Sequence, residues 1–212
     1  MQTVRAALQL PLPGRAAQLT MAVQPRPGDR DDLPHSCPNQ GAVLVLLYPR
    51  DDQLVLPLTL RTQRVELHKG QVSLPGGARE ADDHSFLDTA LREASEEVGV
   101  PRMEVEALGV LTPLYIPVST FCVYPFVGHI PHPFPLRADP NEVQQVIEAP
   151  LERLLDPATR QVEVQERDGQ TYQVPSYRVG GQRVWGATAM ILAEFLTLLR
   201  TALEAEAQDA VR

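Results

Sequence analysis

The sequence predicts a single α/β domain, because strand-like and helical segments interleave along a chain that is too short for two full domains. Its 212 residues are 43% hydrophobic and 22% charged, which is typical of a globular protein. The clearest strand signal is the continuously apolar segment 42–48, and the clearest helical patterns cover 85–98 and 188–205. We expect an N-terminal extension (residues 1–38), one core-bearing domain (39–205) and a C-terminal tail (206–212).

The first elements of the domain read as a hairpin. The extension before them is rich in Pro, Arg and Asp, with a short helix expected at 4–10 and a loop after it. The apolar run AVLVLLY (Ala42–Tyr48) predicts a strand that is buried on both faces. A turn at Asp51–Asp52 then leads to its partner strand at 53–60. Pro57 lacks a backbone donor, so it must lie at an edge or a bulge.

After this hairpin comes a short strand, QVSLPGG, that breaks at Pro75. The segment 85–98 is helical because its apolar residues share one face, and Gly99 stands where a C-terminal cap belongs. The remaining expected elements are strands at 104–111 and 121–127, a mixed signal at 141–155, a polar hairpin at 161–174 around Asp168-Gly169, and a long amphipathic helix at 188–205.

Composition excludes several classes of function. The formal net charge is −8, from 27 acidic and 19 basic residues, and no stripe of Lys and Arg provides the footprint of a duplex-binding protein. No apolar run approaches the roughly 20 residues that span a bilayer, so no membrane association is expected. Cys37 and Cys122 lie far apart and form no CxxC motif, which predicts two isolated thiols. We therefore expect a soluble, cytoplasmic protein.

One helix carries a concentrated acidic face. Glu93, Glu96 and Glu97 stand at i, i+3 and i+4, within an arc of about 100°. At 6 Å and an effective dielectric constant of 20, each pair of carboxylates repels by roughly 3 kcal/mol. A hard divalent cation such as Mg²⁺ turns this repulsion into coordination. The alternative is a solvated acidic face, and the surrounding sequence decides between the two.

That surrounding sequence is GGAREADDHSFLDTALREASEEVGV (Gly76–Val100), in which a glycine pair and a loop precede Arg-Glu-x-x-Glu-Glu-x-Gly. The segment resembles the Nudix box, GX5EX7REUXEEXGU, where U is aliphatic. Its second half matches from Arg92 to Val100. Its first half departs, because Asp83 stands for the glutamate and eight residues separate it from Arg92.

That offset is similar to the coenzyme A pyrophosphatase branch of the Nudix family. The upstream segment LTLRTQRVELHKGQVSLPGG also resembles the branch's coenzyme A signature, LLTxR(S/T/A)x3Rx3Gx3FPGG. Two positions depart from it: Glu66 stands where the signature has Arg, and Leu74 replaces Phe. The matching residues are Arg61, Thr62, Gly70, Pro75, Gly76 and Gly77.

The resemblance implies a Nudix-type α/β/α sandwich with a mixed β-sheet. It further implies Mg²⁺ or Mn²⁺ as cofactor, with an activated water attacking one phosphorus of a diphosphate. Asp83 would orient the loop with Arg92. The implied metal ligands are Glu93, Glu96, Glu97 and the Gly77 carbonyl. The implied catalytic residues are Glu96, Glu97 and Arg92, with Glu142 as candidate base and a plain surface residue as its alternative. Substrate binding is expected from Arg61 and Gly76 of the signature, from Arg64 by its positive charge, and from His68, for which a structural or surface role is the alternative.

The implied substrate is a small nucleotide-type molecule, first of all coenzyme A, which would yield 4′-phosphopantetheine and 3′,5′-ADP. Glu66 reverses a charge that would face this anion and leaves other substrates open: ADP-ribose, dinucleotides or nucleoside triphosphates. A non-catalytic Nudix-like domain that senses a nucleotide is the alternative from another class, although all three box glutamates are present. A homodimer also stays open, since the sequence carries no signal for oligomeric state.

Overall fold

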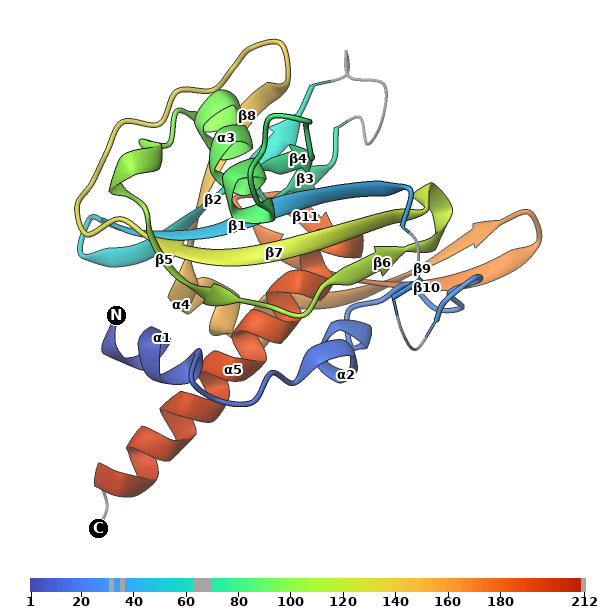
Figure 1. Ribbon diagram of the computed structural model, residues 1–212. Coiled ribbons are helices and arrows are strands. Elements are labelled where there is room, and N and C mark those ends of the chain that lie inside the picture. The colour runs from blue at the N-terminus through green and yellow to red at the C-terminus, as the bar shows by residue number, and fades with distance from the viewer. Residues whose placement is uncertain (31–32, 35–36, 63–69, 211–212) are drawn as a thin grey trace.

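The computed structural model describes residues 1–30, 33–34, 37–62 and 70–210, and it shows a twisted β-sheet with helices on both faces (Figure 1). The strands are β1 (Asn39–Arg50), β2 (Gln53–Arg61), β3 (Val72–Ser73), β4 (Gly76–Ala78), β5 (Glu106–Val110), β6 (Leu114–Ile116), β7 (Phe121–His129), β8 (Val143–Pro150), β9 (Arg160–Arg167), β10 (Gln170–Val179) and β11 (Gln182–Trp185). The α-helices are α1 (Gln2–Ala7), α2 (Gly14–Leu19), α3 (Phe86–Val98), α4 (Leu151–Leu155) and α5 (Gly186–Ala210), and 3₁₀ turns lie at Arg102–Glu104, Pro117–Ser119 and Pro157–Thr159.

Strand β1 is the centre of the main sheet. It runs parallel to β7 and antiparallel to both β2 and β4, so the predicted mixed sheet is confirmed. The strand order is β3-β2-β1-β7-β5, with β8 paired to β2 and β6 paired to β7. A second, three-stranded sheet has the order β11-β10-β9.

The apolar run of β1 is buried because helices cover the sheet on both sides (Figure 1). Leu44 and Leu46 belong to the core on the α3 side, whereas Val45 and Leu47 belong to the core on the α5 side. This alternation confirms the predicted α/β/α arrangement. The α3 side also contains Ala90, Ala94 and Val98, and the α5 side contains Ile191, Phe195 and Leu198.

Helix α5 is longer than predicted, since it starts at Gly186 and continues to Ala210. Among the described residues it is the one helix that is long and apolar enough to cross a membrane by length and composition. The expectation that no apolar segment reaches this length was therefore wrong. In the structure, 61% of its most apolar window is buried inside the protein. That burial is the behaviour of a core helix.

The N-terminal extension packs on α5 instead of leading loosely into the domain. Val4 and Met21 lie in the core on the α5 side. The side chain of Gln18 donates to the buried carboxylate of Glu194 at 2.9 Å, and the backbone N–H of Thr112 donates to the same carboxylate. Helix α2 had no clear sequence signal, and the division at residues 38 and 205 stays a prediction.

Two local predictions can be compared directly with the structure. Pro57 pairs with Glu148 of β8 on one side of β2. On the other side, the pairing of β2 with β1 ends at Val55 and its pairing with β3 begins at Thr59, so Pro57 has no strand partner there that would require a backbone N–H. The prediction of free thiols is wrong, because Cys37 and Cys122 form a disulfide. The parallel pairing of β1 with β7 places Gln40 beside Cys122 and so brings the two cysteines together across 85 residues of sequence.

Candidate active site

The acidic helix α3 is fixed at both ends by local sequence. The side-chain oxygen of Ser85 accepts a hydrogen bond from the backbone N–H of Asp88, which caps the first turn. Gly99 ends the helix in the left-handed conformation, with φ of 74°. These caps fix where Glu93, Glu96 and Glu97 point relative to the sheet.

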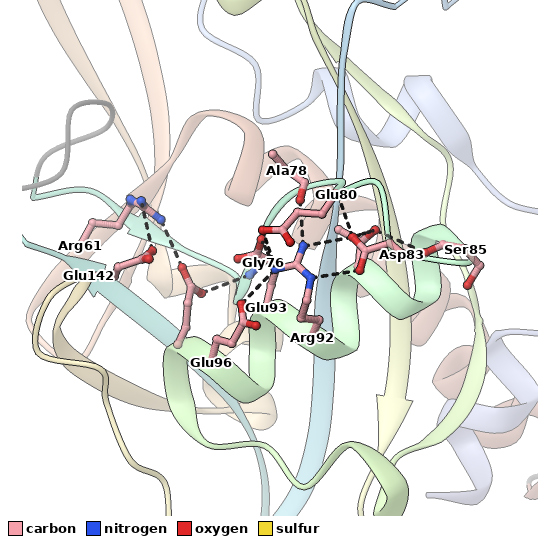
Figure 2. Close-up of polar contacts among 12 residues, drawn as sticks. Arg61, Gly76, Ala78, Glu80, Asp83, Ser85, Arg92, Glu93, Glu96 and Glu142 are labelled. Atoms are coloured by element: carbon pink, nitrogen blue, oxygen red, sulfur yellow. Dashed lines mark hydrogen bonds and ion pairs between the residues drawn. The ribbon is translucent and has the colours of Figure 1, made fainter.

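Arg92 is the centre of a polar network between α3 and the preceding loop (Figure 2). Its guanidinium donates two hydrogen bonds to the Asp83 carboxylate, both at 3.0 Å, and a third to the carbonyl of Ala78 at 3.0 Å. Its Nη1 also donates to Glu93 Oε1 at 3.0 Å and to Glu96 Oε2 at 2.9 Å. The predicted pairing of Arg92 with a carboxylate of the loop is therefore present.

Asp83 is buried, and it is fully hydrogen-bonded. Besides Arg92, the hydroxyl of Thr89 and the backbone N–H of Glu80 donate to its carboxylate, each at 2.9 Å. The hydrogen bonds from Arg92 hold the pKa of the Asp83 carboxyl well below its usual range. The Asp83 carboxylate is therefore ionised at neutral pH, and its hydrogen bonds link the loop to α3.

Strand β4 brings two glycines against the acidic face. A Cβ atom added at Gly77 would lie 2.5 Å from the carboxylate of Glu93, so this carboxylate rests directly on the glycine backbone. Gly76 has a φ of 154°, and an added Cβ would lie 2.3 Å from the carbonyl oxygen of Ala42. Only glycine fits at either position, which explains why β4 begins with a glycine pair.

Glu97 is the most buried of the three glutamates, with 2% of its surface exposed. Its carboxylate accepts a hydrogen bond from the N–H of Gly76 at 3.1 Å and forms an ion pair with Arg61 at 3.2 Å. Burial nevertheless raises the pKa of the Glu97 carboxyl to about 8, and repulsion from Glu93 and Glu142 adds to the rise. Burial also raises the pKa of Glu93.

The structure brings most of the predicted site residues together. Arg61 and Glu142 lie beside the acidic face, with Arg61 Nη2 3.9 Å from Glu142 Oε2 (Figure 2). The side chain of Glu142 is 49% exposed. Arg64 and His68, which were predicted to bind substrate, lie outside the described residues, as does Glu66.

Sequence reasoning missed two residues that position the centre. A Cβ at Gly41 of β1 would lie 2.0 Å from the carbonyl oxygen of Gly77, so Gly41 makes room for a predicted metal ligand. Thr89 is fully buried and holds Asp83, as described above. A glycine at the start of an otherwise apolar strand was the available signal for Gly41.

The chemistry of these groups fits a hard divalent cation. Carboxylate and carbonyl oxygens are the donors that Mg²⁺ and Mn²⁺ accept, and Glu97 places a buried carboxylate among them. Among the described residues, no three acidic, histidine or cysteine side chains converge tightly enough to hold an ion. The three carboxylates are paired with arginines instead, Glu93 and Glu96 with Arg92 and Glu97 with Arg61.

Comparison with known proteins decides the family. Residues 38–167 match the NUDIX domain. The chain belongs to the Nudix hydrolase family. It is 40% identical over 166 residues to the uncharacterized Nudix hydrolase NudL of Salmonella paratyphi B, and equally to NudL of Salmonella newport, covering 78% of this chain and 86% of each relative.

Solved structures agree on the fold. A MutT/nudix family protein from Enterococcus faecalis superposes with a TM-score of 0.52 at 21% identity, covering 80% of this chain and 65% of that one. The MutT protein of Methanosarcina mazei Go1 gives 0.50 at 14% identity, covering 75% and 92%. These structures show the fold, whereas the family match and the NudL relatives show the activity: the chain is a diphosphohydrolase that acts on a nucleoside diphosphate derivative, in a family that typically depends on divalent metals.

Gly77→Ala is expected to lower kcat strongly, because the new Cβ would push the Glu93 carboxylate away from the loop. A displacement of about 1 Å costs on the order of a hundredfold in rate. The matched control is Gly109→Ala, since a Cβ there meets only ordinary contacts at 3.7 Å. Steady-state kinetics on both variants make the comparison. Equal activity of the two would show that the approach of Glu93 to Gly77 has no functional role.

The stability of the metal-free enzyme should fall as pH rises from about 5 to 8. In this window the folded protein keeps the Glu97 proton, whereas the unfolded chain, with the ordinary pKa near 4.3, has lost it. The folded state binds the extra proton, so each pH unit lowers its stability by at most about 1.4 kcal/mol. Thermal unfolding in chelator, compared with Glu97→Gln, isolates this contribution. A pH-independent difference between the two proteins would contradict the raised pKa.

Proposed function

We propose that this enzyme hydrolyses the diphosphate bond of coenzyme A-type substrates, releasing 4′-phosphopantetheine and 3′,5′-ADP, with Mg²⁺ or Mn²⁺ bound at the acidic face of α3. The observation that carries the proposal is a convergence of two sequence segments. Arg61 belongs to the coenzyme A signature alone, whereas Gly76 and Gly77 are shared by the signature and the box segment. In the structure all three contact the box residues Glu93 or Glu97. The groups expected to recognise substrate thus adjoin those expected to hold the metal.

The metal ligands in this proposal are Glu93, Glu96, Glu97 and the carbonyl of Gly77. A cation held there would polarise a phosphoryl oxygen and lower the pKa of an attacking water. Arg92 and Asp83 keep the loop and α3 in register, as their paired hydrogen bonds indicate. Arg61 contributes positive charge beside the carboxylates, where a substrate phosphate would approach.

Glu142 is the candidate general base for the attacking water. It is half exposed and lies next to Arg61, so a water molecule can reach it. It lies close to the box, because Arg61 is 3.9 Å from Glu142 and 3.2 Å from Glu97. Such a base has to be within hydrogen-bond reach of the water in the substrate complex.

A second candidate function is hydrolysis of other nucleoside diphosphate derivatives, and the observation that favours it is Glu66. A negative charge at the position of the signature Arg is unfavourable for the extra 3′-phosphate of coenzyme A. The Salmonella relatives named NudL are themselves described as uncharacterized, so they do not separate the two candidates.

A substrate panel tests the proposal. Coenzyme A, dephospho-coenzyme A, ADP-ribose, a diadenosine polyphosphate and a nucleoside triphosphate are each incubated with Mg²⁺, Mn²⁺, Ca²⁺ or EDTA, and products are identified by mass. We expect the highest kcat/KM on a coenzyme A-type substrate, no activity in EDTA, and little with Ca²⁺ because of its looser coordination geometry. Preference for ADP-ribose, dinucleotides or triphosphates would favour the second candidate. Full activity in EDTA would contradict the metal.

Glu66→Arg is expected to raise kcat/KM for coenzyme A by tenfold or more, with a smaller effect on dephospho-coenzyme A. Exchanging repulsion for attraction between partly exposed charges amounts to roughly 2–3 kcal/mol, or about 30- to 150-fold. The competing arrangement has Arg64 supply the missing charge. In that case Glu66→Arg changes little and Arg64→Ala removes most activity. Efficient wild-type turnover of coenzyme A together with a harmless Arg64→Ala would contradict both arrangements.

A further inference from the structure

Strand β9 (Arg160–Arg167) is an open edge of the small sheet. It pairs along its length with β10, and among the described residues no strand lies on its other side. The β9–β10 hairpin projects from the body of the molecule (Figure 1). Val162 and Val164 are 54% and 68% exposed on this strand. Edge strands are usually blunted by charge, proline or bulges, so exposed β-branched residues are unexpected there.

The register with β10 shows which backbone groups face the open side. Val162 lies opposite Pro175, which has no N–H, so this is not a hydrogen-bonded pair. Hydrogen-bonded and non-bonded pairs alternate in an antiparallel ladder. Arg160, Val162, Val164 and Glu166 therefore direct their N–H and C=O groups away from β10, toward the open edge.

The sequence of this edge is complementary to itself. Consider a second copy running antiparallel with a two-fold axis at Glu163. Arg160 then faces Glu166 of the other copy, and Val162 faces Val164, each pair occurring twice. Moving the axis to Val162 places Arg160 opposite Val164, and moving it to Val164 places Val162 opposite Glu166. Of these three axes, only the one at Glu163 pairs opposite charges with each other and apolar side chains with each other.

The residue on the axis meets its own copy, which would bring two carboxylates together. In each chain, however, Glu163 is already neutralised by Arg178, 3.1 Å away, and by Arg183. The pairing therefore brings together two compensated carboxylates rather than two bare ones.

We propose that β9 is a self-association edge, through which a second copy of this chain pairs antiparallel and joins the two three-stranded sheets into one. The proposal is independent of the substrate. Eight residues a side are fewer than the 20–30 of a standard interface, so we expect a weak dimer that dissociates on dilution.

Sedimentation of the full chain from 1 to 200 µM tests the edge itself. We expect a monomer–dimer equilibrium that Val164→Lys weakens at least tenfold, because a lysine on the edge disfavours strand pairing. The matched control is Val118→Lys, which changes another valine that is 90% exposed and lies outside β9; this variant should dimerise like the wild type. A wild type that is monomeric at 200 µM, or equal effects of the two substitutions, would overturn the proposal.

A charge exchange tests the register. Arg160→Glu places like charges opposite Glu166 at two positions and should weaken the dimer about tenfold or more. Adding Glu166→Arg should restore dimerisation, although it cannot restore the intramolecular hydrogen bond from Arg160 to the carbonyl of Thr20. Failure of the double variant to recover would overturn the axis at Glu163. Since none of these residues lies at the active site, hydrolysis by each variant confirms that it is folded.

Discussion

Replacing Glu97 by glutamine is expected to lower kcat about a thousandfold or more at saturating Mg²⁺, while the fold survives. Glutamine keeps the shape of the side chain but loses the charge that a cation requires, and losing about 4 kcal/mol of transition-state stabilisation corresponds to that factor. The fold survives because burial raises the pKa of the Glu97 carboxyl to about 8, which means that ionising this group lowers the stability of the metal-free protein. Steady-state kinetics and thermal unfolding in chelator measure the two effects.

The control for this substitution is Asp88→Asn, which removes an acidic charge from the first turn of the same helix, away from the cluster. It should leave kcat within a few-fold of the wild type. In metal-free buffer at pH 8, Glu97→Gln should unfold at the same temperature as the wild type or higher. Near-normal turnover of Glu97→Gln with Mg²⁺ present would remove this face of α3 as the active site.

Arg92→Ala is expected to cost the largest amount of stability. Asp83 would keep its negative charge while buried, and removing one partner of a buried ion pair costs about 3–5 kcal/mol. For a chain of this size that corresponds to a decrease in Tm of roughly 6–20 °C. Activity should fall as well, because Arg92 also binds Glu93 and Glu96. Chemical denaturation and kinetics at 25 °C separate the two losses.

The control is Arg102→Ala, since Arg102 is exposed and lies 4.0 Å from Asp88 at the surface. Such a pair contributes about 1 kcal/mol or less. The pH dependence gives a further check. Because the pKa of Asp83 is lowered, the stability from its pairing is present above about pH 4 and is lost as pH falls below that. A stability loss for Arg92→Ala no larger than that for Arg102→Ala would contradict the network.

The parts of the fold that sequence predicts are those with local causes. Ser85 and Gly99 define the ends of α3 because an N-cap hydroxyl and a left-handed glycine act within one turn. The doubly buried β1 and the hairpin at Asp168-Gly169 follow from their own apolar pattern and turn residues. The pairing of Asp83 with Arg92 was expected from the resemblance to the Nudix box, and the structure contains it.

The missed features depend on contacts between distant segments. The disulfide of Cys37 with Cys122 arises from the parallel pairing of β1 and β7, for which cysteine spacing carries no signal. The ion pair of Arg61 with Glu97 joins residues that the sequence analysis assigned to separate roles, substrate binding and metal binding. The close approach of Gly41 to Gly77 requires knowing that β4 pairs with β1. Packing and strand pairing decide these features, and a single sequence does not display them.

We propose that the acidic face of α3, against which Gly77 packs, holds the divalent cation of a diphosphohydrolase. Titration of the metal-free protein with Mn²⁺, followed by electron paramagnetic resonance, measures this without any substrate. The wild type and Asp88→Asn should bind Mn²⁺ with the same affinity, and Glu97→Gln should bind about tenfold more weakly or worse. Equal binding by the wild type and Glu97→Gln, or no binding by the wild type, would contradict the account.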